Sequence, residues 1–283
     1  MTCGLHVHRY DRGADVGADI ATLDLEDSVP GPSKEEARRL VLPFFVRPDR
    51  PEGPVWVVRI NSLRTPDGLR DILALIESRA RPDALLVPKV DSAQDVLILD
   101  QLLGDRLAST FFIVLIETAA GLAAADEIAS ACPRVRALVF GGADLASELG
   151  VPLEWDSVLY ARSRTIVAAT RAGIPALDVP NFAIRDEEQL RFENQRSRAL
   201  GFRGKVAVHP RQVPIINQGY SPDPDEVDRA RRIVAAAEMN GGQIAVLDGG
   251  MIGPPMLQAA RRTLALAERL ERIEAMARPP VRV

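Results

Sequence analysis

Six short apolar runs recur along this chain, and each ends at a charged or polar residue. They cover residues 20–27, 55–61, 85–89, 113–117, 138–144 and 206–209. A parallel strand buried on both faces has no place for a charge along its length. It can carry one at its carboxyl end, where the loops of a barrel build the binding site. The pattern therefore predicts an enzyme whose strands end in a polar mouth.

Helix-like stretches separate these runs, and a further strand is predicted at residues 175–179. The stretches cover residues 33–45, 65–79, 92–103, 121–131, 154–172 and 186–200, the first opened by a predicted capping box of Ser33 and Glu36. Repeated strand-then-helix units predict an α/β fold, and this many units predict a (β/α)8 TIM barrel. Residues 5–9 are the candidate first strand, and the Gly-rich stretch 11–18 is too short for a crossover helix. The first β/α unit is therefore predicted to be shortened.

The repeated strand-then-helix pattern ends after the predicted barrel. Two predicted helices, at residues 225–239 and 255–277, flank a Gly-rich segment at 241–250. We expect residues 1–220 to form a TIM-barrel catalytic domain. Residues 221–283 are expected to form a C-terminal helical extension that acts as a lid over a neighbouring subunit.

Composition excludes several classes of protein. A net charge of −4 with a pI near 5.6 argues against nucleic acid as a partner, because phosphate binding needs a concentrated basic surface. No apolar stretch approaches the roughly 20 residues of a membrane span, and the N-terminus lacks a signal-peptide pattern, so a cytoplasmic protein is expected. Cys3 and Cys132 make neither a disulfide framework nor a complete metal site.

Two carboxylates carry the metal-site hypothesis. Glu117 and Asp144 each follow an apolar run on consecutive predicted strands, so both are expected to point into one mouth. Carboxylates with open coordination positions suit Mg²⁺, which keeps waters and accepts substrate oxygens. The Gly141–Gly142 pair would let the backbone approach a ligand. The alternative is that each acid is a helix N-cap or a member of a structural ion pair.

Arg59 lies in the apolar segment VVRIN, where an inward-facing guanidinium needs an anion. It is predicted either to clamp a substrate carboxylate or to form a buried salt bridge with Glu26 or Asp27. Strand alternation places Asp24 and Glu26 on one face and Asp27 on the other. Glu26 is a candidate to anchor a metal-bound water or to orient Arg59, and the alternative is a simple pair with Lys34.

The basic residues at other strand ends leave more than one chemistry open. The chain has three lysines against 32 arginines. Lys89 or Lys205 would serve a Schiff-base aldolase, but anchoring a carboxylate or phosphate is the favoured role. His209 is a candidate acid or base, although no serine or cysteine nucleophile accompanies it. No phosphate-binding glycine loop follows a strand, so nucleoside-triphosphate and Rossmann sites are not predicted.

Seven segments then carry a resemblance to a known family. In chain order they are GADIATLDLEDSVPGPSKEEAR, VVRIN, LLVPKVDSAQDV, LIETAAGLAAADEIA, VFGGADLASELG, GFRGKVAVHPRQV and DGGMIGPP. They resemble the citrate lyase β-subunit-like (CitE-like) proteins of the HpcH/HpaI aldolase superfamily. The resemblance implies that Glu117 and Asp144 hold Mg²⁺ or Mn²⁺, and that Arg59 binds the acid carboxylate and stabilises an enolate. Glu26 and Asp27 would support the metal shell, with Lys89 and His209 as further ligand-binding candidates.

The same resemblance implies the reaction and the partners. We expect a lyase that cleaves or forms a 3-hydroxyacyl thioester, such as malyl-, methylmalyl-, citramalyl- or citryl-CoA, into a 2-oxo acid and an acyl thioester. The thioester carrier is CoA or an acyl-carrier protein, and the chain is expected to form a homotrimer or hexamer. The alternatives are an aldolase for free hydroxy-oxo acids and a non-catalytic binding or assembly subunit.

Two departures from the family pattern affect this expectation. The usual first strand with its arginine and LFVPG-like turn is replaced by a segment with His8 and Arg9. The family's MID motif, whose aspartate acts as acid or base over the neighbour's site, reads Met251–Ile252–Gly253. Glycine cannot transfer a proton, so aldol cleavage is expected rather than condensation with thioester hydrolysis, unless Asp248 or a water substitutes.

Overall fold

The computed structural model describes residues 1–10, 15–47, 50, 53–240 and 244–277 of the chain. The predicted loop segments at 11–14 and 241–243 lie outside the described residues. The chain forms two compact units, Met1–Gly219 and Tyr220–Val283, and each is described by itself.

The first unit is built on a parallel sheet whose seven strands lie side by side in chain order. They are β1 (Thr2–Cys3), β2 (Ile20–Asp24), β3 (Val55–Arg59), β4 (Ala84–Val87), β5 (Phe111–Ile116), β6 (Val135–Phe140) and β7 (Ala176–Leu177). Parallel strands need crossover connections, and the intervening helices supply them. The predicted α/β fold is confirmed.

A short segment continues the sheet beyond β7. Lys205 forms a parallel bridge with Asp178, and the Val206 N–H donates to Asp178 O at 3.0 Å. On its other side, the Met1 nitrogen donates to Ala207 O at 3.1 Å, next to β1. The predicted last strand at 205–210 is thus reduced to a bridge, which takes the eighth position between the two edges of the sheet.

The first β/α unit is short, as predicted, but the strand expected at residues 5–9 is wrong. These residues belong to a 3₁₀ helix, η1 (Gly4–Arg9), and the strand is the two-residue β1 before it. Gly4 packs so closely against β2 that a Cβ there would lie 2.8 Å from Asp24 O. The buried Tyr10 hydroxyl donates to Ala21 O at 2.6 Å and fixes the far end of this turn. Close packing, rather than strand pairing, therefore decides the path.

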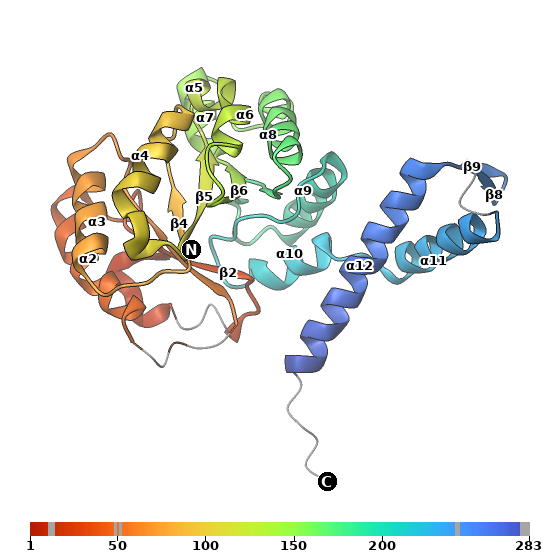
Figure 1. The fold of residues 1–283 in the computed structure, drawn as a ribbon, viewed down its shortest axis with the longest axis horizontal. Coiled ribbons are helices and arrows are strands. Elements are labelled where there is room, and N and C mark those ends of the chain that lie inside the picture. Colours follow the sequence, from red (N-terminus) through yellow and green to blue (C-terminus); the bar gives the residue numbers. More distant parts are fainter. Residues whose placement is uncertain (11–14, 48–49, 51–52, 241–243, 278–283) are drawn as a thin grey trace, which may run out of the picture. The chain divides into compact units, whose positions relative to one another are not determined.

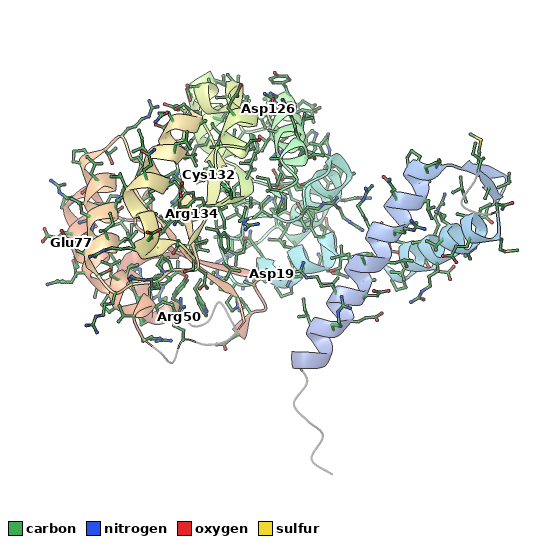
Figure 2. The ribbon with its side chains drawn as sticks, viewed as in Figure 1. Asp19, Arg50, Glu77, Asp126, Cys132 and Arg134 are labelled. Atoms are coloured by element: carbon green, nitrogen blue, oxygen red, sulfur yellow. The ribbon has the colours of Figure 1, made fainter. Side chains whose placement is uncertain are left out.

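Helices surround the sheet (Figure 1). They are α2 (Lys34–Val41), α3 (Pro66–Glu77), α4 (Ala93–Leu103), α5 (Ala119–Ala123), α6 (Ala125–Ala129), α7 (Gly142–Leu149), α8 (Leu159–Arg171), α9 (Glu187–Leu200) and α10 (Gln212–Tyr220), with short 3₁₀ turns η2 (Gly31–Ser33), η3 (Leu42–Phe45) and η4 (Gly104–Leu107). Charged side chains such as those of Glu77 on α3 and Asp126 on α6 lie on these outer helices (Figure 2).

Side-chain caps open some of the helices, but not the helix for which a cap was predicted. The predicted capping box of Ser33 and Glu36 is wrong, because Ser33 ends η2 with φ −100° and ψ 3° and its side chain caps nothing. Thr65 does cap α3 through the Gly68 N–H, and a capping box of Ser92 and Asp95 opens α4.

Alternate positions of the central strands form the core inside the sheet's curve. Its buried members are Val57, Ala84, Leu86, Ile113, Leu115, Ala137 and Val139. Because side chains two residues apart share one face of a strand, Arg59 continues the inward series of β3 and Glu117 continues that of β5. The core pattern therefore delivers these two charged side chains to the carboxyl end of the strands, where barrel sites form.

The second unit consists of two helices and a hairpin. The helices are α11 (Pro224–Met239) and α12 (Pro254–Ala277), and the hairpin joins β8 (Ala245–Leu247) to β9 (Gly250–Ile252). Asp248 and Gly249 both have positive φ, as two-residue hairpin turns often require. The lid role of residues 221–283 remains a prediction. Among the described residues, no helix has the length and hydrophobicity of a membrane span.

Candidate active site

Glu117 and Asp144 meet at one cavity of about 340 Å³ at the carboxyl end of the sheet. Glu117 follows β5 directly and is 2% exposed. The predicted strand at residues 138–144 ends earlier, because β6 stops at Phe140 and Asp144 stands in the first turn of α7. The two carboxylates therefore come from a strand end and a helix start.

Every described residue that lines the cavity is polar or charged, although aliphatic parts of these side chains also face it. Its lining residues are Ser62, Arg64, Lys89, Asp91, Glu117, Thr118, Asp144, Ser147 and Glu148. They come from the loops after β3, β4 and β5 and from helix α7. Such a lining suits a small polar ligand or an ion rather than a hydrocarbon chain.

Negative charge is in excess around Glu117. Burial raises the pKa of Glu117 to about 8, and the charges of Glu26 and Asp144 act in the same direction. The Lys89 N–H donates to Glu117 Oε1 at 2.8 Å but compensates only part of this cost. A cation placed between these carboxylates would relieve the remaining repulsion.

Gly141 lets the backbone pass close to Glu117. A Cβ at position 141 would lie 2.6 Å from Glu117 Oε2, closer than real side chains allow. The glycine is therefore needed for the close approach of the chain after β6 to this carboxylate, while the expected approach of the Gly141–Gly142 backbone to a ligand stays a prediction.

We predict that Gly141→Ala displaces the Glu117 carboxylate and weakens divalent metal binding by about tenfold or more, the range seen when groups that orient metal ligands are changed. Isothermal titration with Mg²⁺ or Mn²⁺ measures the effect. Gly31→Ala is the matched control, because a Cβ at Gly31 meets nothing within 4 Å. Equal metal affinity in the two variants would contradict the assignment of Glu117 as a ligand.

Arg59 is held by a carboxylate that the sequence interpretation did not pair with it. Its Nε and Nη2 donate to the two carboxylate oxygens of Asp24, both at 2.7 Å. Asp24 is fully buried and pairs with Arg59 in the register of β2 and β3. Burial opposes ionisation, but the Arg59 hydrogen bonds outweigh it and hold the pKa of Asp24 below its usual value. Asp24 therefore occupies Nε and Nη2 of Arg59, and Nη1 remains for other contacts.

Glu26 and Asp27 lie on the same side of Arg59. Arg59 Nη1 is 2.9 Å from Glu26 Oε2 and 3.5 Å from Asp27 Oδ2. The expectation that Asp27 faces away is wrong, because β2 ends at Asp24 and strand alternation does not extend to the bend that follows. The predicted pairing of Arg59 with Glu26 and Asp27 is present, in addition to the pair with Asp24.

Lys89 connects this ion network to the cavity. Its Nζ lies 2.8 Å from Glu26 Oε1 and 3.5 Å from Asp27 Oδ1. Burial opposes the charge, but Glu26 and Asp27 outweigh it and raise the pKa of Lys89. A Schiff base needs a neutral amine, so this environment disfavours that chemistry and favours a role as an anchoring cation.

Glu26 keeps one acceptor open. Its Oε2 is buried and, among the described residues, has no hydrogen-bond donor, because the nearby Arg59 nitrogen is not aligned for one. Burial raises the pKa of Glu26 against the opposing effect of Arg59. A buried acceptor without a donor is a place where a water or a ligand hydroxyl is expected to bind.

The structure does not bring every candidate to the cavity. His209 lies in the bend before α10, accepts the Arg211 N–H at Nδ1 and does not line the cavity. Lys205 is fully buried in ion pairs with Asp178 and Glu193, at 2.9 and 3.3 Å. Neither lines the cavity described above, and Arg59, Glu26 and Asp27 are also absent from its lining.

The sequence analysis did not identify Asp24 as the partner of Arg59, and of the residues that line the cavity it named only Lys89, Glu117 and Asp144. Asp24 was assigned to the correct face without a partner, although its position at the end of a strand beside β3 is a usable signal. Arg64 lines the cavity and pairs with Asp91 at 2.9 Å and Asp95 at 3.0 Å. No sequence pattern distinguishes it from the other arginines of an arginine-rich chain.

The residues of the site lie within the part of the chain that a protein-family model matches. The model of the HpcH/HpaI aldolase/citrate lyase family matches residues 10–210. The chain belongs to this family. The match covers the strands and loops that carry Asp24, Arg59, Lys89, Glu117 and Asp144.

Curated relatives within the HpcH/HpaI family align over most of their length. A (3S)-malyl-CoA thioesterase of Cereibacter sphaeroides is 36% identical over 263 residues, which cover 91% of this chain and 90% of the relative. An L-malyl-CoA/beta-methylmalyl-CoA lyase of Rhodobacter capsulatus is 33% identical over 289 residues, covering 92% and 90%.

Solved structures agree with the family assignment. Protein CitE from Mycobacterium tuberculosis, in complex with magnesium, acetoacetate and coenzyme A, has a TM-score of 0.80 and 31% identity, covering 94% of this chain and 96% of that one. RipC from Yersinia pestis has a TM-score of 0.69 and 38% identity, covering 75% and 93%. The resemblance to CitE-like proteins is therefore confirmed.

Proposed function

We propose that this chain is a Mg²⁺-dependent carbon–carbon lyase that splits a 3-hydroxyacyl-CoA thioester of the malyl type into a 2-oxo acid and an acyl thioester. The observation that carries the proposal is the convergence of Glu117, Asp144 and Lys89 on one polar cavity beside the Arg59 ion network. The relatives named as malyl-CoA lyases and the CitE complex with magnesium and coenzyme A support the substrate class.

The residues present fit a magnesium ion. Glu117 and Asp144 supply hard oxygen ligands, and the pKa of Glu117, raised by burial and by neighbouring carboxylates, marks a place short of positive charge. Among the described residues no group of three His, Cys, Asp or Glu side chains could hold a metal ion. Two carboxylates suit Mg²⁺ well, because this ion keeps several waters and accepts substrate oxygens. When bound, Mg²⁺ would polarise the oxygens of the oxo-acid portion.

The chain's own residues supply the rest of the chemistry. Cleavage removes the proton of the substrate's 3-hydroxyl group, breaks the adjacent carbon–carbon bond and leaves the electron pair on the thioester as an enolate, which is then protonated. Arg59 remains charged because Asp24 fixes it, and its Nη1, which lies beside Glu26 and Asp27, is proposed to offer positive charge to the enolate oxygen. Lys89 is proposed to attract the acid carboxylate. Glu26 Oε2, which lacks a donor, is proposed to accept a hydrogen bond from the substrate hydroxyl or a water.

The lyase is preferred to a thioesterase for one reason in this chain. Gly253, which follows β9, stands where the family's motif has an aspartate that transfers a proton. Hydrolysis of the thioester needs that transfer, whereas cleavage of the carbon–carbon bond leaves the thioester intact. The lid over a neighbouring subunit, the trimer or hexamer and an acyl-carrier partner remain predictions.

A second candidate is an aldolase for free hydroxy-oxo acids. The polar and charged types of the lining residues favour it, since these residues can bind the oxygens of a free acid. The two functions differ in their products, because only the first releases a thioester. A non-catalytic subunit would bind ligands without turnover.

We expect EDTA to abolish cleavage of a malyl- or citramalyl-type CoA thioester and Mg²⁺ to restore it. The loss follows because Mg²⁺ is proposed to polarise the oxygens of the oxo-acid portion. A coupled screen of thioesters with Mg²⁺, followed by mass spectrometry of the released oxo acid and thioester, measures the effect and identifies the products.

The control is the same assay with Ca²⁺ in place of Mg²⁺, which tests whether the smaller octahedral ion is required. Turnover that survives complete metal removal would contradict the proposal. Products that contain no thioester would favour the aldolase for free acids instead.

A further inference from the structure

The three lysines of this arginine-rich chain have similar surroundings. Each Nζ lies between two oxygen acceptors: Lys34 contacts Leu25 O and Glu26 O, Lys89 contacts Glu26 and Asp27, and Lys205 contacts Asp178 and Glu193. An ammonium is a compact point charge with three rotatable donors, whereas a guanidinium is a flat and longer fork. Lysine therefore stands where two oxygens converge, and two of the three lysines meet at Glu26.

Lys34 holds the backbone of the loop that follows β2. It is the first residue of α2 and is half-buried, and its Nζ donates to Leu25 O at 2.8 Å and to Glu26 O at 2.6 Å. The Val29 N–H also donates to Glu26 O, at 2.9 Å. The sequence alternative of a Lys34–Glu26 side-chain pair is wrong, because the contact is with the carbonyl of Glu26 and the carboxylate belongs to Lys89.

The peptide groups of Glu26 are fixed on both sides. Its N–H donates to Asp24 Oδ1 at 2.8 Å, and its carbonyl accepts from Lys34. Asp24 is in turn held by Arg59. The backbone of Glu26 is therefore tied to the sheet at one end and to α2 at the other, and from this position its carboxylate contacts Lys89 and lies beside Arg59.

We propose that Lys34 is a positioning residue. It holds the backbone carbonyl of Glu26, and this contact keeps the Glu26 carboxylate beside Lys89 and Arg59 in the active site. The side chain of Lys34 does not itself line the cavity. The consequence for chemistry rests on the proposed function, in which Glu26 supports the metal site. The mechanical part, that Lys34 fixes Glu26, stands on the hydrogen bonds alone.

The first test measures the loop itself, without metal. Lys34→Met should raise amide hydrogen exchange across residues 25–29 by about tenfold or more, because two carbonyls lose their donor and the loop opens locally. Arg39→Met, at an exposed position of the same helix, is the matched control and should leave this exchange unchanged. If Lys34→Met does not fold, Lys34→Gln is compared with the same control. Unchanged exchange at residues 25–29 would overturn the inference.

The second test asks whether Lys34 acts through Glu26. Mn²⁺ binding, followed by electron paramagnetic resonance, is measured for Lys34→Met, Glu26→Gln and the double variant. Lys34→Met should weaken binding by about tenfold alone and by less than about twofold in the Glu26→Gln background, because a missing carboxylate cannot be misplaced. Equal effects in both backgrounds would overturn the inference. A native protein that binds no Mn²⁺ would contradict the proposed function instead, and hydrogen exchange would still decide the role of Lys34.

Discussion

Glu117→Gln is expected to lower turnover of the thioester by about a thousandfold, because loss of a metal ligand removes several kcal/mol of transition-state stabilisation. Glutamine has the shape of the protonated acid, and burial already raises the pKa of Glu117 to about 8. The metal-free variant should therefore fold at least as stably as the native protein while it binds Mg²⁺ weakly. Steady-state kinetics, Mg²⁺ titration and thermal unfolding in EDTA measure the three quantities.

The matched control is Glu77→Gln, at an exposed position on α3 (Figure 2). It makes the same chemical change away from the cavity, and it should alter neither metal affinity nor turnover. A Glu117→Gln enzyme with native metal affinity would contradict the metal site. Native turnover together with native affinity would also remove Glu117 from the mechanism.

Arg59→Met is expected to cost about 3–5 kcal/mol in the free energy of unfolding, because it leaves the buried Asp24 carboxylate without its partner. Turnover should be lost as well, since no cation remains to meet the enolate. Urea unfolding and steady-state kinetics measure the two effects. Arg70→Met is the matched control, because its pair with Asp67 is exposed and is worth about 0–1 kcal/mol.

The double variant Asp24→Asn/Arg59→Met separates stability from chemistry. Removing both charges should recover most of the lost stability, since no unpaired charge stays buried. Turnover should remain absent, because the catalytic cation is still missing. Recovery of turnover along with stability would show that Arg59 has only a structural role.

The direction of a residue at a strand end could be predicted where the alternation of inward-facing residues continues past the last residue of the strand. Glu117 follows the alternation of Ile113 and Leu115, so its direction could be predicted from the apolar pattern of β5. Asp27 could not, because the strand before it ends at Asp24 and a bend has no fixed alternation. Asp144 was correctly expected at the cavity, but it was assigned to the wrong element. It lies in α7, which begins at Gly142, because β6 already ends at Phe140.

Pairing between distant residues was the part that the sequence did not specify. Asp24 and Arg59 are 35 residues apart, and only the register of β2 and β3 makes them neighbours. A pair of Lys34 with the Glu26 carboxylate was the alternative considered from the sequence, and Lys34 binds two carbonyls instead. His209 ends an apolar run as the other candidates do, yet it lies outside the cavity lining.

Periodicity along the chain determined the α/β class, the order of the strands and the short first unit, because these depend on which residues are apolar and where they recur. Motifs determined the family. The tertiary structure alone decided which polar strand ends share one cavity, which charges neutralise each other and which carboxylates are left in excess. The physical reason is that hydrophobic burial is read from local pattern, whereas the energy of a charge depends on every group that folding brings near it.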